Sequence, residues 1–211
     1  MSSNPLWEVR RGLLVAVAAP SGAGKTTLCV RMTERFKNLR YAISCTTRPP
    51  REGEVDGEHY HFVSQTRFKE MVDQGAFLEW AVVHGNFYGT PHAEVKAMRD
   101  QGGDVLLDLD VQGVASIRRL ERVDGVFCLI LPPSQEALRQ RLVTRGKDTE
   151  DEIERRMTIA VKEIAQVDLF DYVIVNDDLD DATRQLESII RAEHTRRERL
   201  RKDWFRTTFF P

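Results

Sequence analysis

Apolar residues in this chain gather in short, nearly unbroken runs, which alternate with segments where apolar residues recur at helical spacing. Residues 13–18 form such a run, as expected of a strand buried on both faces of a parallel sheet. The same pattern predicts further strands over residues 104–109, 126–131 and 171–176, and helices over residues 91–101, 111–120, 135–144 and 178–202. Strands that alternate with helices predict a doubly wound α/β sheet.

The pattern changes between residues 44 and 90, where β-favouring runs are separated by polar turns. Strands are predicted over residues 41–47, 59–63, 76–83 and 87–90, and one helix over residues 65–74. Ser64 is the expected N-cap of that helix, and Gly75 is its expected stop. The turn at residues 84–86 joins the last two strands, so this stretch is interpreted as a small antiparallel insertion.

A glycine-rich loop separates the first strand from the first helix. Residues 19–27 read Ala-Pro-Ser-Gly-Ala-Gly-Lys-Thr-Thr, and strand, loop and helix in this order are the context of a phosphate-binding loop. Gly22 and Gly24 allow a tight turn that aims backbone N–H groups at an anion. Lys25 is expected to reach the terminal phosphates of a nucleotide, and the Thr26 hydroxyl to bind Mg²⁺. This context disfavours the alternative, a chance glycine turn beside a surface lysine.

The loop departs at one position from the pattern GxxxxGK(S/T), because Ala19 stands where the first glycine is expected. Alanine tolerates most of the same backbone space but not positive φ. The loop therefore requires Ala19 to stay at negative φ.

Two acidic residues lie where the strand over residues 104–109 ends. Asp108 and Asp110 occupy the carboxyl edge of the sheet, where open α/β sheets bind ligands. A carboxylate there can hold Mg²⁺ directly or through water, beside Lys25 and Thr26. Aspartate also simply terminates strands, so it is the combination with the glycine loop that favours metal binding.

Composition narrows the classes of function. The 211 residues carry 31 Lys plus Arg and 33 Asp plus Glu, and a net charge of −2 argues against a general nucleic-acid binder. Three separated cysteines favour reduced, structural thiols over disulfides or a zinc site. The first eleven residues lack a signal-peptide pattern, and no run of 18 apolar residues predicts a membrane span. We therefore expect a cytoplasmic protein that binds neither nucleic acid nor membrane.

Arginines next to prolines mark a second candidate phosphate site. Arg48 and Arg51 lie three residues apart beside Pro49 and Pro50, and Tyr60 follows. Arginine forks bind phosphate bidentately, and a tyrosine hydroxyl can add a further hydrogen bond. A solvated loop with incidental arginines is an equally open interpretation of this stretch alone.

Together these motifs resemble those of the guanylate kinase family. The residues that carry the resemblance are the block Ser-Cys-Thr-Thr-Arg-Pro-Pro-Arg-Glu-Gly-Glu-Val-Asp-Gly from position 44, Tyr60, Phe-Leu-Glu-Trp from position 77, Gly-Asn-Phe-Tyr-Gly-Thr from position 85, Asp-Leu-Asp-Val-Gln-Gly from position 108 and Arg-Leu-Val-Thr-Arg-Gly from position 141. The resemblance runs from the first strand to Asn176, and Ala19 is the motif position that departs from it.

The resemblance implies a Mg²⁺-dependent kinase that transfers the γ-phosphoryl group of ATP to GMP; whether dGMP also serves is left open. The implied ATP-binding residues are Pro20, Ser21, Gly22, Ala23, Gly24, Lys25, Thr26, Thr27 and Asn176. The implied GMP-binding residues are Ser44, Arg48, Arg51, Tyr60, Glu79, Tyr88, Thr90 and Asp110. Thr26 and Asp108 are the implied metal ligands. Without the family, Glu79 is interpreted as an ordinary outward-facing strand carboxylate.

The resemblance also implies a lid over the ATP phosphates. Its arginines are Arg141, Arg145 and Arg156, which join Lys25 and Arg48 as the implied catalytic residues. Surface charge on a helix is the alternative interpretation of the first two. The segment over residues 145–162 is heavily charged and poor in large apolar residues, which favours a mobile flap over core.

The expected architecture is a P-loop core with an inserted small mixed α/β GMP-binding domain and a helical lid. The expected limits are core 1–43, GMP-binding domain 44–90, core 91–133, lid 134–165, and core with the C-terminal helix 166–211. The rival hypotheses are a catalytically inactive phosphopeptide-binding module of the same fold and a kinase for another nucleoside monophosphate. The sequence leaves open whether the protein is a monomer or a homo-oligomer, and the aromatic tail from Trp204 to Phe210 is expected to dock on the core or on another subunit.

Overall fold

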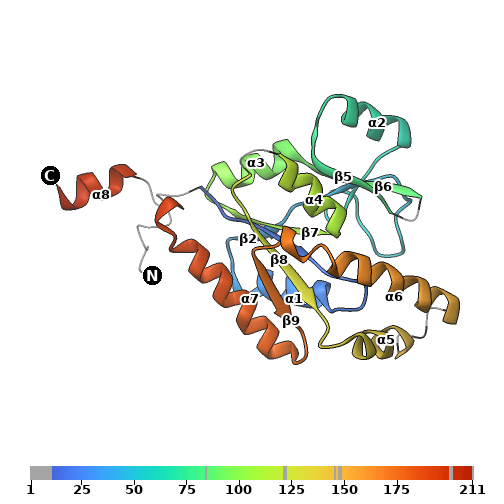
Figure 1. The fold of residues 1–211 in the computed structure, drawn as a ribbon. Helices are drawn as coiled ribbons and strands as arrows, with labels where there is room; N and C mark the ends of the chain where they lie inside the picture. The colour runs from blue at the N-terminus through green and yellow to red at the C-terminus, as the bar shows by residue number, and fades with distance from the viewer. Residues whose placement is uncertain are drawn as a thin grey trace.

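The computed structural model describes residues 11–83, 85–120, 123–144, 146, 149–199 and 202–210, with backbone alone for 202–205. Its main sheet has five parallel strands in the order β2-β7-β1-β8-β9. These strands are β1 (Leu14–Ala18), β2 (Leu39–Tyr41), β7 (Asp104–Leu109), β8 (Val126–Leu131) and β9 (Tyr172–Val175). The predicted doubly wound α/β sheet is confirmed (Figure 1).

Helices cover both faces of the sheet because alternate residues of β1 enter separate cores. Leu13, Val15 and Val17 pack in one core with α1 (Lys25–Arg35) and α7 (Leu179–His194). Leu14 and Ala16 face the other, with α3 (His92–Asp100) and α4 (Val111–Arg119). The strand is buried on both faces, as its unbroken apolar run predicts.

A second sheet, in the order β4-β3-β6-β5, stands beyond one edge of the core. It contains β3 (Cys45–Thr46), β4 (His61–Phe62), β5 (Phe77–Val83) and β6 (Asn86–Pro91), and it carries α2 (Gln65–Asp73). The Ser64 side chain caps α2 as predicted, by accepting from the Arg67 backbone N–H. Phe68 of α2 stacks on Phe77, with 4.5 Å between ring centroids.

Two predictions for this region are wrong in detail. The run over residues 41–47 divides, so that β2 ends in the main sheet and β3 begins the small one. The small sheet is also not purely antiparallel, because β3 and β4 pair in parallel. The chain between them is long enough to return to the same end of the sheet before β4 starts.

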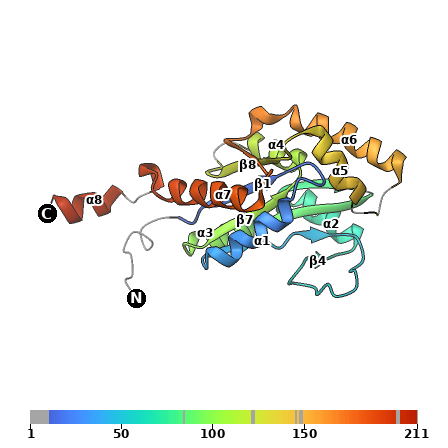
Figure 2. The same ribbon diagram turned by 90° about the horizontal axis from the view of Figure 1, so that it is seen from below.

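The charged segment expected to be a flap contains a regular helix, α6 (Glu150–Ile164), which packs on α5 (Gln135–Thr144). Thr149 and Glu152 form a capping box at its start. Ile153 and Ala160 lie seven residues apart, so they share one face of α6 and pack against Leu138 and Leu142 of α5. A few well-spaced apolar residues therefore suffice to hold a charged helix in place (Figure 2).

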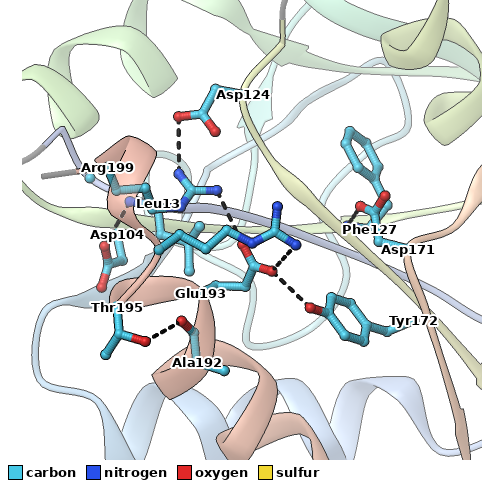
Figure 3. A network of polar contacts seen from close by, with 12 residues as sticks. Leu13, Asp104, Asp124, Phe127, Asp171, Tyr172, Ala192, Glu193, Thr195 and Arg199 are labelled. Atoms are coloured by element: carbon cyan, nitrogen blue, oxygen red, sulfur yellow. Dashed lines mark hydrogen bonds and ion pairs between the residues drawn. The ribbon is translucent and has the colours of Figure 1, made fainter.

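The prediction of one closing helix to residue 202 is wrong, because α7 ends at His194. A short turn, η3 (Arg197–Arg199), follows, and α8 (Lys202–Phe209) stands apart from the body of the molecule in both ribbon views. A network of charges around the buried side chains of Glu193 and Arg199 fixes the end of α7 (Figure 3). No helix in the described part of the chain is long and apolar enough to cross a membrane.

Candidate active site

The phosphate loop joins β1 to α1 in a shape that depends on its glycines. Gly22 has φ +100° and Gly24 has φ +93°, both in the left-handed region that favours glycine. A Cβ on Gly24 would lie 2.3 Å from Asn176 Nδ2, so the loop also lacks room for a side chain there. Ala19 is buried as part of the core, and its negative φ stays a prediction.

Lys25, at the start of α1, meets the carboxyl end of β7. Its Nζ lies 2.5 Å from Asp108 Oδ1 and donates to the Leu109 carbonyl oxygen at 2.5 Å. The parallel register of β1 and β7 places Val17 beside Asp108, which brings the strand end to the loop that follows β1. The proximity expected of Lys25, Thr26 and Asp108 is therefore built by one strand pairing.

A cavity of about 500 Å³ lies between the main sheet and the small sheet. Lys25, Thr26 and Asp108 line it from the core. The predicted residues that line it from the other side are Ser44, Tyr60, Glu79, Tyr88, Thr90 and Asp110. Two sets of residues that are far apart in the sequence thus face one open cavity.

Glu79 is a buried carboxyl group in the wall of this cavity, and its pKa is raised. Although the strand pattern predicts an outward-facing side chain, Glu79 is 8% exposed. Burial raises its pKa to about 7, the hydrogen bond from Thr90 opposes that rise, and the nearby Asp110 adds to it. Thr90 Oγ1 donates to Glu79 Oε1 at 2.6 Å, and Ser44 Oγ lies 3.3 Å from Thr90 Oγ1.

Asp110 and Gly113 shape the wall behind Glu79. Asp110 caps α4, since its Oδ1 accepts from the Gly113 backbone N–H at 2.7 Å. A Cβ on Gly113 would lie 3.0 Å from Glu79 Oε2. The start of α4 is therefore in close contact with the buried carboxyl group.

Arg48 lies next to this cavity and is 9% exposed. Its Nη1 and Nη2 donate to the two carboxylate oxygens of Glu54 at 2.5 and 2.6 Å. The Tyr60 ring lies 5.0 Å from the Arg48 guanidinium carbon. The Arg51 side chain is exposed, while its backbone N–H donates to Glu54 at 2.7 Å.

A second cavity, of about 660 Å³, opens on the other side of the phosphate loop. Five predicted residues line it: Gly22, Gly24, Thr27, Arg141 and Asn176. Asn176 is 5% exposed and donates to the Ala23 carbonyl oxygen at 2.7 Å. Arg141 Nη2 in turn donates to the Asn176 carbonyl oxygen at 2.8 Å.

Arg156, Arg145 and Pro20 are the predicted residues that remain to be placed, the first two in the lid and the third in the phosphate loop. Arg156 Nη1 on α6 donates to Ser21 Oγ at 2.9 Å, which connects the lid to the phosphate loop. Arg145 lies outside the described residues. Pro20 precedes Ser21 in the same loop, and its carbonyl accepts from Ala23 at 3.1 Å.

Sequence reasoning missed several residues at these sites. Tyr41, Glu58 and His59 line the first cavity, and Glu54 holds Arg48. Glu54 belongs to the arginine-glycine-glutamate block, but nothing in the sequence shows that the two side chains pair. Such contacts depend on how the loop folds back on itself.

Comparison with known proteins places this geometry in a family context. The family model for guanylate kinase matches residues 11–193. A guanylate kinase of Syntrophotalea carbinolica is 50% identical over 194 residues, which cover 92% of each chain. One from Clostridium perfringens (strain 13 / Type A) is 42% identical over 200 residues, which cover 95% of this chain and 92% of the relative. The crystal structure of guanylate kinase from Anaplasma phagocytophilum superposes with a TM-score of 0.74 at 30% identity, covering 95% of this chain and 96% of that one.

Proposed function

The chain belongs to the guanylate kinase family, and we propose how its residues transfer the γ-phosphoryl group of ATP to GMP. The observation that carries the proposal is the cavity of about 500 Å³, which Lys25 and Asp108 line on one side and Glu79 and Thr90 on the other. Phosphoryl transfer requires two anionic reactants held in line with their charge neutralised. We therefore assign the meeting point of the two substrates to this cavity.

We propose that GMP binds among the residues of the small sheet and Asp110. Guanine offers N1–H and N2–H donors, which the Glu79 carboxylate can accept together. Its O6 acceptor suits the Thr90 hydroxyl, which turns its single proton from Glu79 Oε1, 2.6 Å away, to the base when guanine binds. Adenine has an acceptor at N1, so it leaves the buried carboxylate without a partner and is rejected.

We propose that ATP binds on the phosphate loop, with its base toward the cavity that Asn176 lines. The backbone N–H groups of the loop and the start of α1 attract the phosphates, and Lys25 neutralises the transferred group. Arg141 and Arg156 add positive charge in this proposal, since Arg156 contacts Ser21 of the loop and Arg141 contacts Asn176 beside it. A phosphate oxygen of GMP is already ionised, so no general base is needed.

Thr26 and Asp108 fit Mg²⁺, because a hydroxyl and a carboxylate are the hard oxygen ligands that this ion prefers. The ion supplies charge neutralisation at the transferred phosphoryl group. Lys25 pairs with Asp108 at 2.5 Å, so Asp108 is kept within reach of the loop. The three buried, free cysteines support a reducing, cytoplasmic location as part of this proposal.

The rival from another class is an inactive phosphopeptide-binding module. The presence of Lys25, Thr26 and Asp108 around one cavity disfavours it, since binding alone does not require them. Coupled ADP-release assays with ATP, Mg²⁺ and GMP, AMP, UMP or CMP decide between them. We expect turnover with GMP; a folded protein silent with all four nucleotides contradicts the proposal.

Lys25→Met tests the phosphate loop directly. We expect kcat to fall by at least about 100-fold, because the charge that stabilises the transferred phosphoryl group is lost. Lys37→Met, an exposed change in the turn just after the C-terminal end of α1, is the matched control and is expected to keep the wild-type rate. A Lys25→Met protein that retains most of its kcat contradicts the assignment.

A further inference from the structure

The guanidinium of Arg48 is held from its end by Glu54. Glu54 accepts from Nη1 at 2.5 Å and from Nη2 at 2.6 Å, which is a bidentate ion pair. The side chains are 9% and 17% exposed, so the pair is largely shielded from water. The same carboxylate accepts from the Arg51 backbone N–H, and Glu54 N donates back to the Arg51 carbonyl at 3.0 Å.

This pairing leaves Nε of the guanidinium without a hydrogen-bond partner among the described residues, while the Tyr88 phenol is a further partner of the group. Arginine has five N–H donors in a rigid plane. Glu54 takes one from each terminal nitrogen, and the Pro49 carbonyl takes a second from Nη1 at 3.0 Å. The Nε atom is itself buried. Its N–H and the adjacent N–H of Nη2 point the same way and form a second, side-on fork.

Two neighbours of Arg48 line the first cavity, although the Arg48 side chain itself does not. The Tyr60 ring lies 5.0 Å from the guanidinium carbon, and Tyr60 lines the cavity. Tyr88 lines it too, and after Glu54 its phenol is a further hydrogen-bonding partner that raises the pKa of Arg48. A buried donor without a partner costs free energy unless a ligand satisfies it.

We infer that Glu54 is a positioning residue for the acceptor substrate. It binds the terminal nitrogens of Arg48, so that the side-on fork of Arg48 is left to bind the phosphate of a nucleoside monophosphate. The inference rests on the proposed function, because it assumes that the acceptor phosphate binds beside Arg48. It adds a residue that does not itself touch the substrate. Arg48 lowers the pKa of Glu54 to about 2, so the Glu54 carboxylate of this ion pair stays ionised throughout the neutral range.

Glu54→Gln tests the role of the ion pair with Arg48, because the amide keeps the shape of the side chain but loses its charge and one acceptor oxygen. We expect the KM for GMP to rise at least tenfold, with kcat and the KM for ATP within twofold of wild type, since the loss concerns binding of one substrate. Glu54→Asp keeps the charge and is expected to recover part of the affinity. Glu52→Gln, an exposed change in the same loop, is the control and is expected to match wild type.

The opposite result identifies the competing arrangement, in which Glu54 occupies the place of the phosphate. In that case Glu54→Gln lowers the KM for GMP, and that result, or an unchanged KM, overturns the inference. A wild-type protein that does not phosphorylate GMP overturns the proposed function instead.

A measurement on the wild-type protein covers the case in which Glu54→Gln does not fold. The Arg48 Nε–H signal in ¹⁵N–¹H NMR spectra, assigned by its loss in Arg48→Lys, is followed while GMP or guanosine is added. We expect it to shift with GMP and to stay in place with guanosine, because guanosine lacks the phosphate. An unchanged signal at saturating GMP overturns the inference.

Discussion

Glu79 is a residue whose chemistry is changed by its place in the fold. Its pKa of about 7 in the native protein lies above the ordinary value of 4.5, chiefly because burial disfavours the charged form. Accepting two N–H groups from guanine requires the ionised form. Guanine binding therefore favours loss of the proton, and affinity for the base depends on pH near neutrality.

We predict that the affinity for guanosine falls about tenfold between pH 8 and pH 6, as Glu79 gains its proton. Guanosine is the ligand of choice because the phosphate of GMP titrates in the same range. Calorimetric titrations across this range measure the effect, and Glu79→Gln is expected to bind weakly with no such slope. A flat profile for the wild-type protein contradicts the assigned role.

The same shift predicts how Glu79 affects stability. Since the native pKa is raised, the folded protein holds a proton that the unfolded chain loses between about pH 4.5 and pH 7. The stability that this group contributes is full below pH 4.5 and is lost as the pH rises through 7, by about 3 kcal/mol. Urea unfolding at pH 5 and pH 8 should show a smaller difference for Glu79→Gln than for wild type.

At the scale of elements, the end of α7 is fixed by charges buried away from the active site (Figure 3). Glu193 is 1% exposed and accepts from the Tyr172 hydroxyl at 2.8 Å. Arg199, with a side chain 6% exposed, lies 3.4 Å from Glu193 and 2.9 Å from Asp124. The turn after α7 is therefore drawn back onto the core, and the helix cannot continue in a straight line.

We predict that Glu193→Ala lowers the free energy of unfolding by about 3 to 5 kcal/mol, because it leaves the buried Arg199 without one of its carboxylates. Glu198→Ala is the control, since that side chain is 70% exposed, and we expect a change below about 0.5 kcal/mol. Urea titrations measure both, and equal stabilities show that the network contributes little. The kcat of Glu193→Ala at low temperature is expected to stay that of wild type.

At the scale of the whole molecule, the C-terminal helix is separate from the globular body. Phe209 and Phe210 are 60% and 77% exposed, and α8 projects away from the sheets. The described aromatic side chains of the tail are therefore not buried against this chain's own core, and the side chains of Trp204 and Phe205 lie outside the described residues. Docking on another subunit stays a prediction.

Removal of residues 202–211 is expected to leave the melting temperature within about 2 °C of the full chain, since little apolar surface of the described tail is buried. Thermal unfolding followed by circular dichroism measures this. A large drop shows that the tail packs on the fold in solution. The molar mass of both forms, from light scattering, decides whether the tail joins two subunits.

Much of the architecture follows from local pattern. The apolar run over residues 104–109 predicts β7 to the residue, and the glycine loop is recognisable because strand, turn and helix signals lie next to one another. These features need no knowledge of distant residues. The unbroken apolar run over residues 13–18 likewise predicts that β1 is buried on both faces.

Contacts between distant residues were decided only by the tertiary structure. Glu79 is buried because α4 closes over it through Asp110 and Gly113, so strand periodicity alone gives it the wrong environment. The parallel pairing of β3 with β4 depends on the path of the loop between them. The helix α7 ends where ion pairs of Arg199 hold the following turn against the core. Sequence by itself determined most of the elements and the chemical groups available, because these depend on neighbours along the chain. Burial, pairing and the junction of the two nucleotide cavities depend on neighbours in space.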